Sequence, residues 1–214
     1  MRDFLVLRAL PVYVDILLLK DRFGHCKRPV KKVFDLAKAG YLFPLRRGHY
    51  LNLSSDDYRD VSLEYLANSL YGPSYISLEW ALYHYSLIPE RVERVTSVTT
   101  RPAWSVETPL GFFSYEHLNR NRYPCGYGVA ANSNVKFFIA TPEKALIDLV
   151  SLRTRSNKWS AATNIEQFLH EDLRLDTEHF FEIASAEFLR ELLPDYNRNS
   201  KEARLIKWLL SKFN

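Results

Sequence analysis

The most regular pattern of hydrophobic and polar positions in the chain lies between residues 28 and 40. At about 100° per residue, one face of a helix through this segment carries apolar side chains: Val30, Val33, Phe34 and Ala37. The opposite face carries charged side chains: Arg28, Lys31, Lys32, Asp35 and Lys38. Pro29 suits the first helical position and Gly40 suits the C-terminal stop. The pattern predicts an amphipathic helix whose outer face is basic.

A β-hairpin is predicted directly after this helix. Two apolar, aromatic-rich runs at 41–45 and 49–53 surround a turn made of Arg46, Arg47 and Gly48. Pro44 has no N–H to donate to a sheet, so its strand is expected at an edge.

Residues 11–23, apolar on one side and followed by Gly24, predict another helix before the basic one. A helix, a basic helix and a hairpin with two arginines at its tip are typical of a winged helix-turn-helix. The major groove of DNA admits a helix, and a basic hairpin can reach flanking phosphates or the minor groove. Small α+β domains that bind no DNA can show the same order, so the pattern alone leaves both interpretations open.

The rest of the chain predicts a larger mixed domain. The pattern favours helices at 63–71, 77–85 and 141–152, and strands at 92–100, 104–108, 110–115 and 135–140. The polar and acidic segment 54–60 is a natural junction. We therefore predict an α+β fold with a winged helix-turn-helix at 1–60, an α+β domain at 61–214 and an all-helical tail at 154–214 within it.

Charge is concentrated at the N-terminal end. The net charge of +4 over 214 residues indicates little, but residues 1–60 hold 12 basic and 7 acidic side chains. Residues 61–153 hold 8 of each, and residues 154–214 hold 9 basic and 10 acidic side chains. Such a local excess is the electrostatic footprint that a phosphate backbone selects, although a solvated basic surface is the plainer alternative.

No known catalytic constellation stands out in the sequence. The chain has no nucleotide-binding glycine motif, no G-x-S-x-G elbow, no carboxylate two residues before a lysine, and no metal-ligand spacing among its six histidines. We therefore expect no enzyme activity, metal or cofactor. The remaining candidate site is Glu143, Lys144 and Asp148, which share one helix. They are more simply explained as first-turn residues and an i, i+4 ion pair.

The location that these features favour is the cytoplasm. Cys26 and Cys125 lie far apart and fit a reducing compartment. The most apolar stretch, residues 12–19, contains Asp15 and is far shorter than the roughly 20 residues that a membrane helix needs. No secretory signal pattern opens the chain.

Several segments together resemble one known family. Residues 45–50, Leu-Arg-Arg-Gly-His-Tyr, resemble the RRGxY end of an antitoxin winged helix. Residues 73–84, from Pro-Ser-Tyr-Ile-Ser to Ala-Leu-Tyr-His, and Leu-Ile-Pro-Glu at 87–90 are similar to a signature of AbiEi-type antitoxins. Segments 99–101, 111–115 and 140–149 follow in the family's order, so the resemblance spans residues 28–152. One departure is Tyr85, where the family usually has glycine after the histidine.

This resemblance implies a bacterial type IV antitoxin from an abortive-infection system, which defends the cell against phage. Its N-terminal winged helix would bind inverted repeats in its own promoter and repress the operon. Its larger domain would counteract a nucleotidyltransferase-like toxin, commonly without a stable complex. The helical tail carries no segment that resembles the family.

The leading hypothesis is therefore a DNA-binding repressor and antitoxin. Its expected contacts with double-stranded DNA come from the basic helix and the wing: Arg28, Lys31, Lys32, Lys38, Arg46, Arg47 and His49. Asp35 is expected to pair with Lys31 or Lys38, the alternative being to accept a hydrogen bond from a cytosine amino group. The second hypothesis is a protein-interaction module that binds a toxin or another partner without binding DNA.

Overall fold

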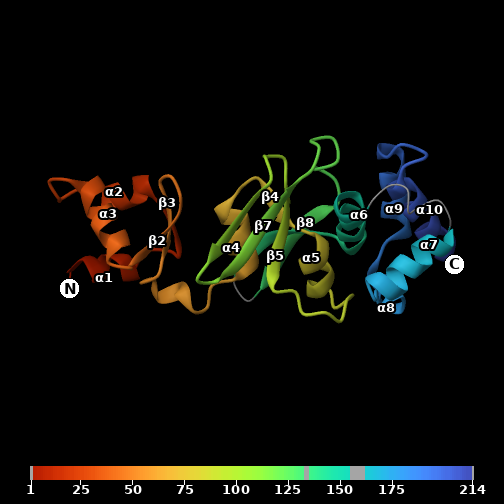
Figure 1. Ribbon diagram of the computed structural model, residues 1–214, viewed down its shortest axis with the longest axis horizontal. Coiled ribbons are helices and arrows are strands. Elements are labelled where there is room, and N and C mark those ends of the chain that lie inside the picture. Colours follow the sequence, from red (N-terminus) through yellow and green to blue (C-terminus); the bar gives the residue numbers. More distant parts are fainter. Residues whose placement is uncertain (1, 133–134, 155–161, 214) are drawn as a thin grey trace.

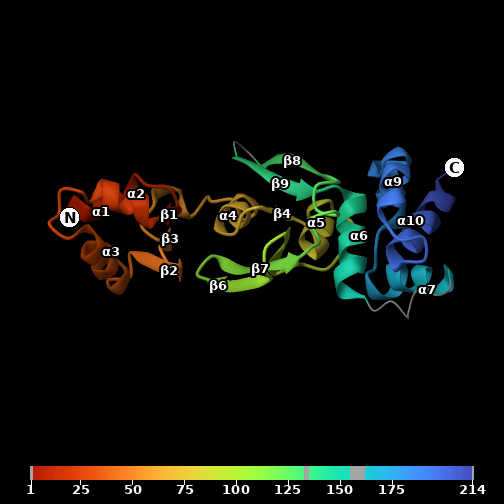
Figure 2. The same cartoon turned by 90° about the horizontal axis from the view of Figure 1, so that it is seen from above.

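The computed structural model describes residues 2–132, 135–154 and 162–213. The fold is mixed α+β, as predicted, and its parts lie in chain order along one long axis (Figure 1). Helices and short strands of the N-terminal part occupy one end, a larger sheet the middle and helices of the C-terminal part the other end. Figure 2 shows the same order from above, with α6 lying between the sheet and the C-terminal helices.

The N-terminal part contains three helices and three strands. In chain order these are α1 (Arg2–Arg8), β1 (Tyr13–Asp15), α2 (Ile16–Arg22), α3 (Pro29–Lys38), β2 (Leu42–Arg46) and β3 (His49–Asn52). The strands form an antiparallel sheet in the order β1-β3-β2. Pro44 therefore lies on an edge strand, which confirms the prediction. The helices cover the sheet with their own apolar core, which includes Leu7, Leu19, Phe23 and Leu42.

The single helix predicted at 11–23 is wrong. Residues 13–15 instead pair with β3, with Tyr13 opposite Leu51 and Asp15 opposite His49. The helix begins at Ile16 because the Asp15 carboxylate accepts a hydrogen bond from the Leu18 N–H at 2.8 Å and caps it. The short β1 strand positions this cap beside the hairpin.

The basic helix forms as α3, within one residue or two of its predicted ends. Gly40, with φ of +79°, ends it in a Schellman motif, in which the Tyr41 N–H donates to the Leu36 carbonyl at 3.1 Å. Its buried face, however, is rotated from the predicted one. Leu36 and Val33 are buried, whereas Val30 and Phe34 are each 58% exposed. The assignment of Val30 and Phe34 to the inner face is therefore wrong, because the buried face of the helix is centred between Val33 and Leu36.

The central part is a six-stranded mixed sheet with three helices packed on it. Its elements are η1 (Asp56–Tyr58), α4 (Leu63–Leu70), β4 (Ser74–Ile76), α5 (Leu78–His84), β5 (Arg94–Thr99), β6 (Trp104–Thr108), β7 (Gly111–His117), β8 (Tyr127–Asn132), β9 (Val135–Ala140) and α6 (Pro142–Arg153). The strand order is β6-β7-β5-β4-β9-β8. The β4–β9 and β5–β7 pairs are parallel and the others antiparallel. The four predicted strands are confirmed, whereas the pattern predicts neither β4 nor β8.

The described part of the tail is helical, as predicted; residues 155–161 and 214 of the predicted tail lie outside the described residues. Its elements are α7 (Ala162–Gln167), η3 (Phe168–Asp172), α8 (Thr177–Ile183), α9 (Ala186–Leu192), η4 (Leu193–Asp195) and α10 (Lys201–Lys212). Buried tail residues such as Phe180, Leu205 and Leu209 share one apolar core with the sheet. Within the described ranges, every helix is too short or too polar to traverse a bilayer.

Candidate functional site

The outward side of α3 carries charge and apolar surface together. Lys31 and Asp35 form an exposed ion pair at 2.9 Å, so the predicted pairing of Asp35 is confirmed. The Lys38 ammonium lies 5.2 Å from the centre of the Phe34 ring, within range of a cation–π contact. Arg28 is exposed at the start of the helix, where its side chain makes no capping hydrogen bond to the backbone. This side of α3 can therefore present cations and an aromatic ring to one ligand.

Lys32 does not share this side. Its ammonium donates to the Asp3 carboxylate of α1. That hydrogen bond raises the pKa of Lys32 and offsets the effect of desolvation, which lowers it. Lys32 therefore joins α3 to α1 and has its charge balanced within the protein.

The two hairpin arginines point to different surroundings. Arg47 is exposed in the turn. The Arg46 guanidinium lies 5.5 Å from the centre of the Tyr71 ring, which belongs to the larger core. Among the described residues, its buried Nε has no hydrogen-bond partner. Of the predicted arginine pair, the structure leaves Arg47 toward solvent and turns Arg46 toward the central sheet.

His49 is held by the N-terminal sheet. Its Nδ1 lies 2.7 Å from the Tyr13 hydroxyl, and the two rings stack with a centroid distance of 5.8 Å. Burial and the nearby positive charge of Arg46 lower the pKa of His49. A neutral, half-buried imidazole adds no positive charge to the surface at neutral pH.

The hairpin tip rests against the start of α2. The Ile16 N–H donates to the Gly48 carbonyl at 2.7 Å, and Gly48 adopts a φ of +77°. Further exposed cations that the predicted site did not include lie at the end of α2 and in the turn before α3: Lys20, Arg22 and Lys27. The excess of basic residues in positions 1–60 was the signal, but the sequence pattern assigned these three to no face of a helix.

The candidate trio on α6 lies in the interior. Lys144 and Asp148 are buried and form an ion pair, which confirms their predicted i, i+4 pairing. The second oxygen of Asp148 accepts hydrogen bonds from the Tyr75 and Ser77 hydroxyls, each at 2.9 Å. The buried Glu143 carboxylate accepts the N–H of Ser185, the residue that caps α9. Each of the three is buried, and its contacts join α6 to neighbouring parts of the fold.

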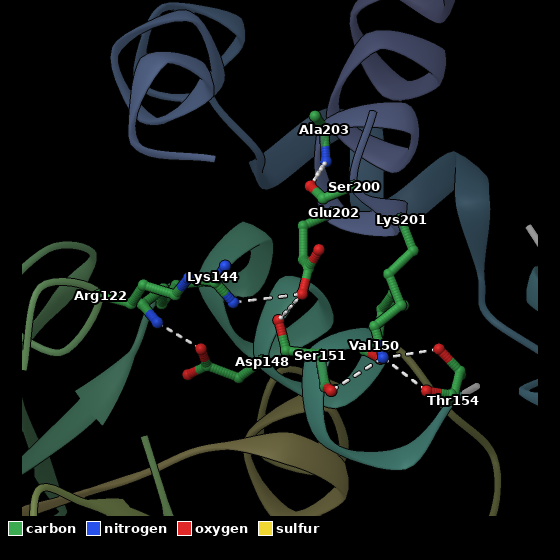
Figure 3. A network of polar contacts seen from close by, with 10 residues as sticks. All are labelled: Arg122, Lys144, Asp148, Val150, Ser151, Thr154, Ser200, Lys201, Glu202 and Ala203. Atoms are coloured by element: carbon green, nitrogen blue, oxygen red, sulfur yellow. Dashed lines mark hydrogen bonds and ion pairs between the residues drawn. The ribbon is translucent and has the colours of Figure 1, made fainter. Parts of the chain in front are cut away.

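A second polar group fixes the tail to α6 (Figure 3). The Glu202 carboxylate accepts from Ser151 at 2.8 Å and from Arg122 at 3.3 Å. Burial disfavours its charge, but hydrogen bonds from its own backbone and from Ser151 outweigh burial and lower the pKa of Glu202. Lys201 donates to the Ser151 and Thr154 carbonyls at the C-terminal end of α6. These contacts satisfy carbonyls that a helix end leaves without partners.

A pocket of about 230 Å³ lies beside the central sheet. Its lining carries no charged side chain: Asn68, Gly72, Pro73, Ser74, Tyr123, Tyr127 and Phe138. Burial raises the pKa of Tyr123 to about 12, so its hydroxyl stays protonated at neutral pH. The lining suits an uncharged group rather than an ion. The described residues also bring together no set of three His, Cys, Asp or Glu side chains that could hold a metal.

Comparison with models of known protein families gives no match, and comparison with curated protein sequences gives none either. A solved structure, that of the RV2827C protein from Mycobacterium tuberculosis, is similar in fold. The similarity covers 99% of this chain and 81% of that chain, with a TM-score of 0.56 and 14% sequence identity. At this identity the similarity shows the fold alone.

Proposed function

We propose that the chain is a DNA-binding transcriptional regulator whose residues 1–60 form a winged helix-turn-helix. The observation that carries the proposal is the outward face of α3, which is basic and follows α2 and a short turn. In helix-turn-helix proteins the second helix lies in the major groove and its N-terminal residues contact base edges. The order α1-β1-α2-α3-β2-β3, with β2 and β3 as the wing, is consistent with that arrangement.

Within this proposal the basic residues divide into two groups. Arg28, Lys31 and Lys38 of α3 and Arg47 of the turn bind the duplex, because their side chains are exposed. Lys32, Arg46 and His49 act indirectly, since each makes its contacts inside the protein. They support the shape of the domain and contribute less to the attraction of phosphates.

The antitoxin role rests on the resemblance of the central part to AbiEi-type antitoxins. In this proposal the protein works in the cytoplasm, represses its own operon at promoter inverted repeats and counteracts a nucleotidyltransferase-like toxin. Because Glu143, Lys144 and Asp148 are buried, the larger domain is expected to act through contacts at its surface rather than by catalysis at these three residues. A neighbouring gene for such a toxin, and rescue of cells that express it, would support this half.

The test of DNA binding is a salt titration with duplex DNA from upstream of the gene. The variant Lys31→Ala/Lys38→Ala/Arg47→Ala should bind more weakly and show a shallower dependence of log K on log salt. The slope should change by about 0.9 for each phosphate that the variant no longer neutralises. Fluorescence anisotropy at four salt concentrations measures both quantities.

A control variant should change the net charge equally at the opposite end of the chain. Arg190→Ala/Arg198→Ala/Lys207→Ala removes three exposed cations of the tail and should leave affinity and slope unchanged. Equal binding by the wild type and the α3–turn variant would contradict the proposal. Absence of any anisotropy change with duplex DNA, together with a co-purifying toxin, would favour the protein-interaction alternative.

A further inference from the structure

Two large apolar side chains stand on the exposed side of the basic helix. Val30 and Phe34 are each 58% exposed, although α3 has an interior face that buries Val33 and Leu36. At about 100° per residue, Val30, Phe34 and Lys38 follow one another in steps of about 40° along the same side. The apolar pair is therefore followed, on the same side of the helix, by the cation of Lys38.

Phosphate binding explains the cations of this face but not its apolar pair. Contacts to phosphate need hydrogen-bond donors or positive charge, and neither valine nor phenylalanine supplies them. The base edges in the major groove do offer an apolar group, the 5-methyl group of thymine. Phenylalanine and other apolar side chains are suitable partners for it.

Position along the helix points the same way. Val30 and Phe34 belong to the first six residues of α3, which spans Pro29–Lys38. The N-terminal part of a recognition helix is the part that contacts base edges. Arg28 precedes the pair in sequence, Lys31 lies between its two members and Lys38 follows it. All three cations are exposed, so phosphate contacts around the pair would exclude water from it.

We propose that Phe34, with Val30 one turn before it, reads thymine methyl groups in the major groove of the operator. This inference rests on the proposed function, because it requires α3 to enter the groove. Lys38, 5.2 Å from the ring centre, orients the Phe34 ring and brings positive charge to the same groove. The specificity of the protein then includes methyl recognition in addition to any hydrogen bonds from Arg28 or Lys31.

The experiment begins by selecting bound sites from a pool of random-sequence duplexes with the wild-type protein. Each thymine of the selected site is then replaced by deoxyuridine, which keeps the hydrogen-bonding groups and removes only the methyl. The wild type should lose about fourfold in affinity at one or two positions, the value for one buried methyl group. At the position that its ring contacts, Phe34→Ala should bind the thymine and uracil forms equally, and it should keep the salt slope of the wild type.

Val129→Ala is the matched control, since Val129 is 61% exposed on β8 of the central sheet. It should retain the full difference between thymine and uracil. Because Phe34 is largely exposed, its variant should also keep the circular-dichroism spectrum and melting temperature of the wild type.

The outcomes separate the two proposals. If the wild type selects no site and binds no duplex at any salt concentration, the proposed function fails, and the apolar pair belongs to a contact with another protein. If a site is selected but uracil has no effect, or if Phe34→Ala keeps the full effect, methyl recognition is overturned while DNA binding stands.

Discussion

The imidazole of His49 lies in a position where protonation is disfavoured. Its Nδ1 is 2.7 Å from the Tyr13 hydroxyl, and Arg46 contributes a nearby positive charge. Burial is the larger cause of the lowered pKa and Arg46 the second, while the Asp15 carboxylate opposes both. The residue is thus a pH-sensitive part of the N-terminal sheet.

The sign of the pH effect follows from linkage. In the unfolded chain His49 takes up a proton as the pH falls through 6.5, its ordinary value, whereas the folded protein resists this uptake. The stability that neutral His49 contributes is present above about pH 6.5 and is lost as the pH falls through the lower pKa of the folded state. The urea midpoint of the wild type should therefore fall between about pH 7.5 and pH 5.5 more than that of His49→Gln. Parallel pH profiles for the two proteins would exclude this role.

At the scale of elements, α6 shows what sequence reasoning can and cannot reach. Thr141 caps the helix by accepting the Lys144 N–H, and Pro142 is its first residue, as predicted. The residues from Pro142 to Val150 are nevertheless all buried, so no hydrophobic stripe marks an inner face. Local capping chemistry can be predicted from the sequence, whereas burial on every side depends on the sheet and the tail that cover the helix.

The same distinction explains the other differences. The strands β4 and β1 have three residues each, too few for alternation to be recognised, and pair through partners distant in sequence. On α3, the predicted periodicity is right but the centre of the buried arc is not, since the predicted face omits Leu36. Charge alone identifies the basic candidates, but whether Lys32 or Arg46 faces solvent depends on Asp3 and Tyr71, which belong to other parts of the fold.

The two i, i+4 ion pairs Lys144–Asp148 and Lys31–Asp35 allow a direct comparison of buried and exposed charge. Lys144→Met leaves the Asp148 carboxylate buried without its cation and should lower the free energy of unfolding by about 3–5 kcal/mol. Lys31→Met removes the same kind of pair at the surface of α3 and should cost less than about 1 kcal/mol. Urea unfolding followed by far-ultraviolet circular dichroism measures both. Similar costs for the two variants would show that the interior pair does not stabilise the fold.

Across the whole molecule, the tail and the central sheet form one packed unit. They share an apolar core, and Lys201 and Glu202 fasten α10 to the last turns of α6. The N-terminal helices have a second core of their own. Val12 and Leu51 nevertheless extend from the N-terminal sheet into the larger core, and Arg46 lies against Tyr71.

Loss of the Lys201 side chain should loosen the attachment of the tail. Lys201→Ala leaves the Ser151 and Thr154 carbonyls without their donor and should destabilise the protein by about 1–2 kcal/mol. Amide hydrogen exchange should accelerate first in α10. Lys207→Ala, on an exposed position of the same helix, is the control and should leave exchange in α10 unchanged. Equal acceleration in both variants would mean that the contacts to α6 do not hold the tail.

The long axis of the molecule places α3 near one end and α10 near the other (Figure 1). In a copy bound to DNA through α3, α10 would therefore lie far from the part of the chain that contacts the duplex. Occupation of the operator and recognition of a protein at the tail would not compete for space. A partner that removes the protein from DNA would then either cover the N-terminal part or act through the contacts that join it to the larger core, namely Arg46–Tyr71 and the packing of Val12 and Leu51.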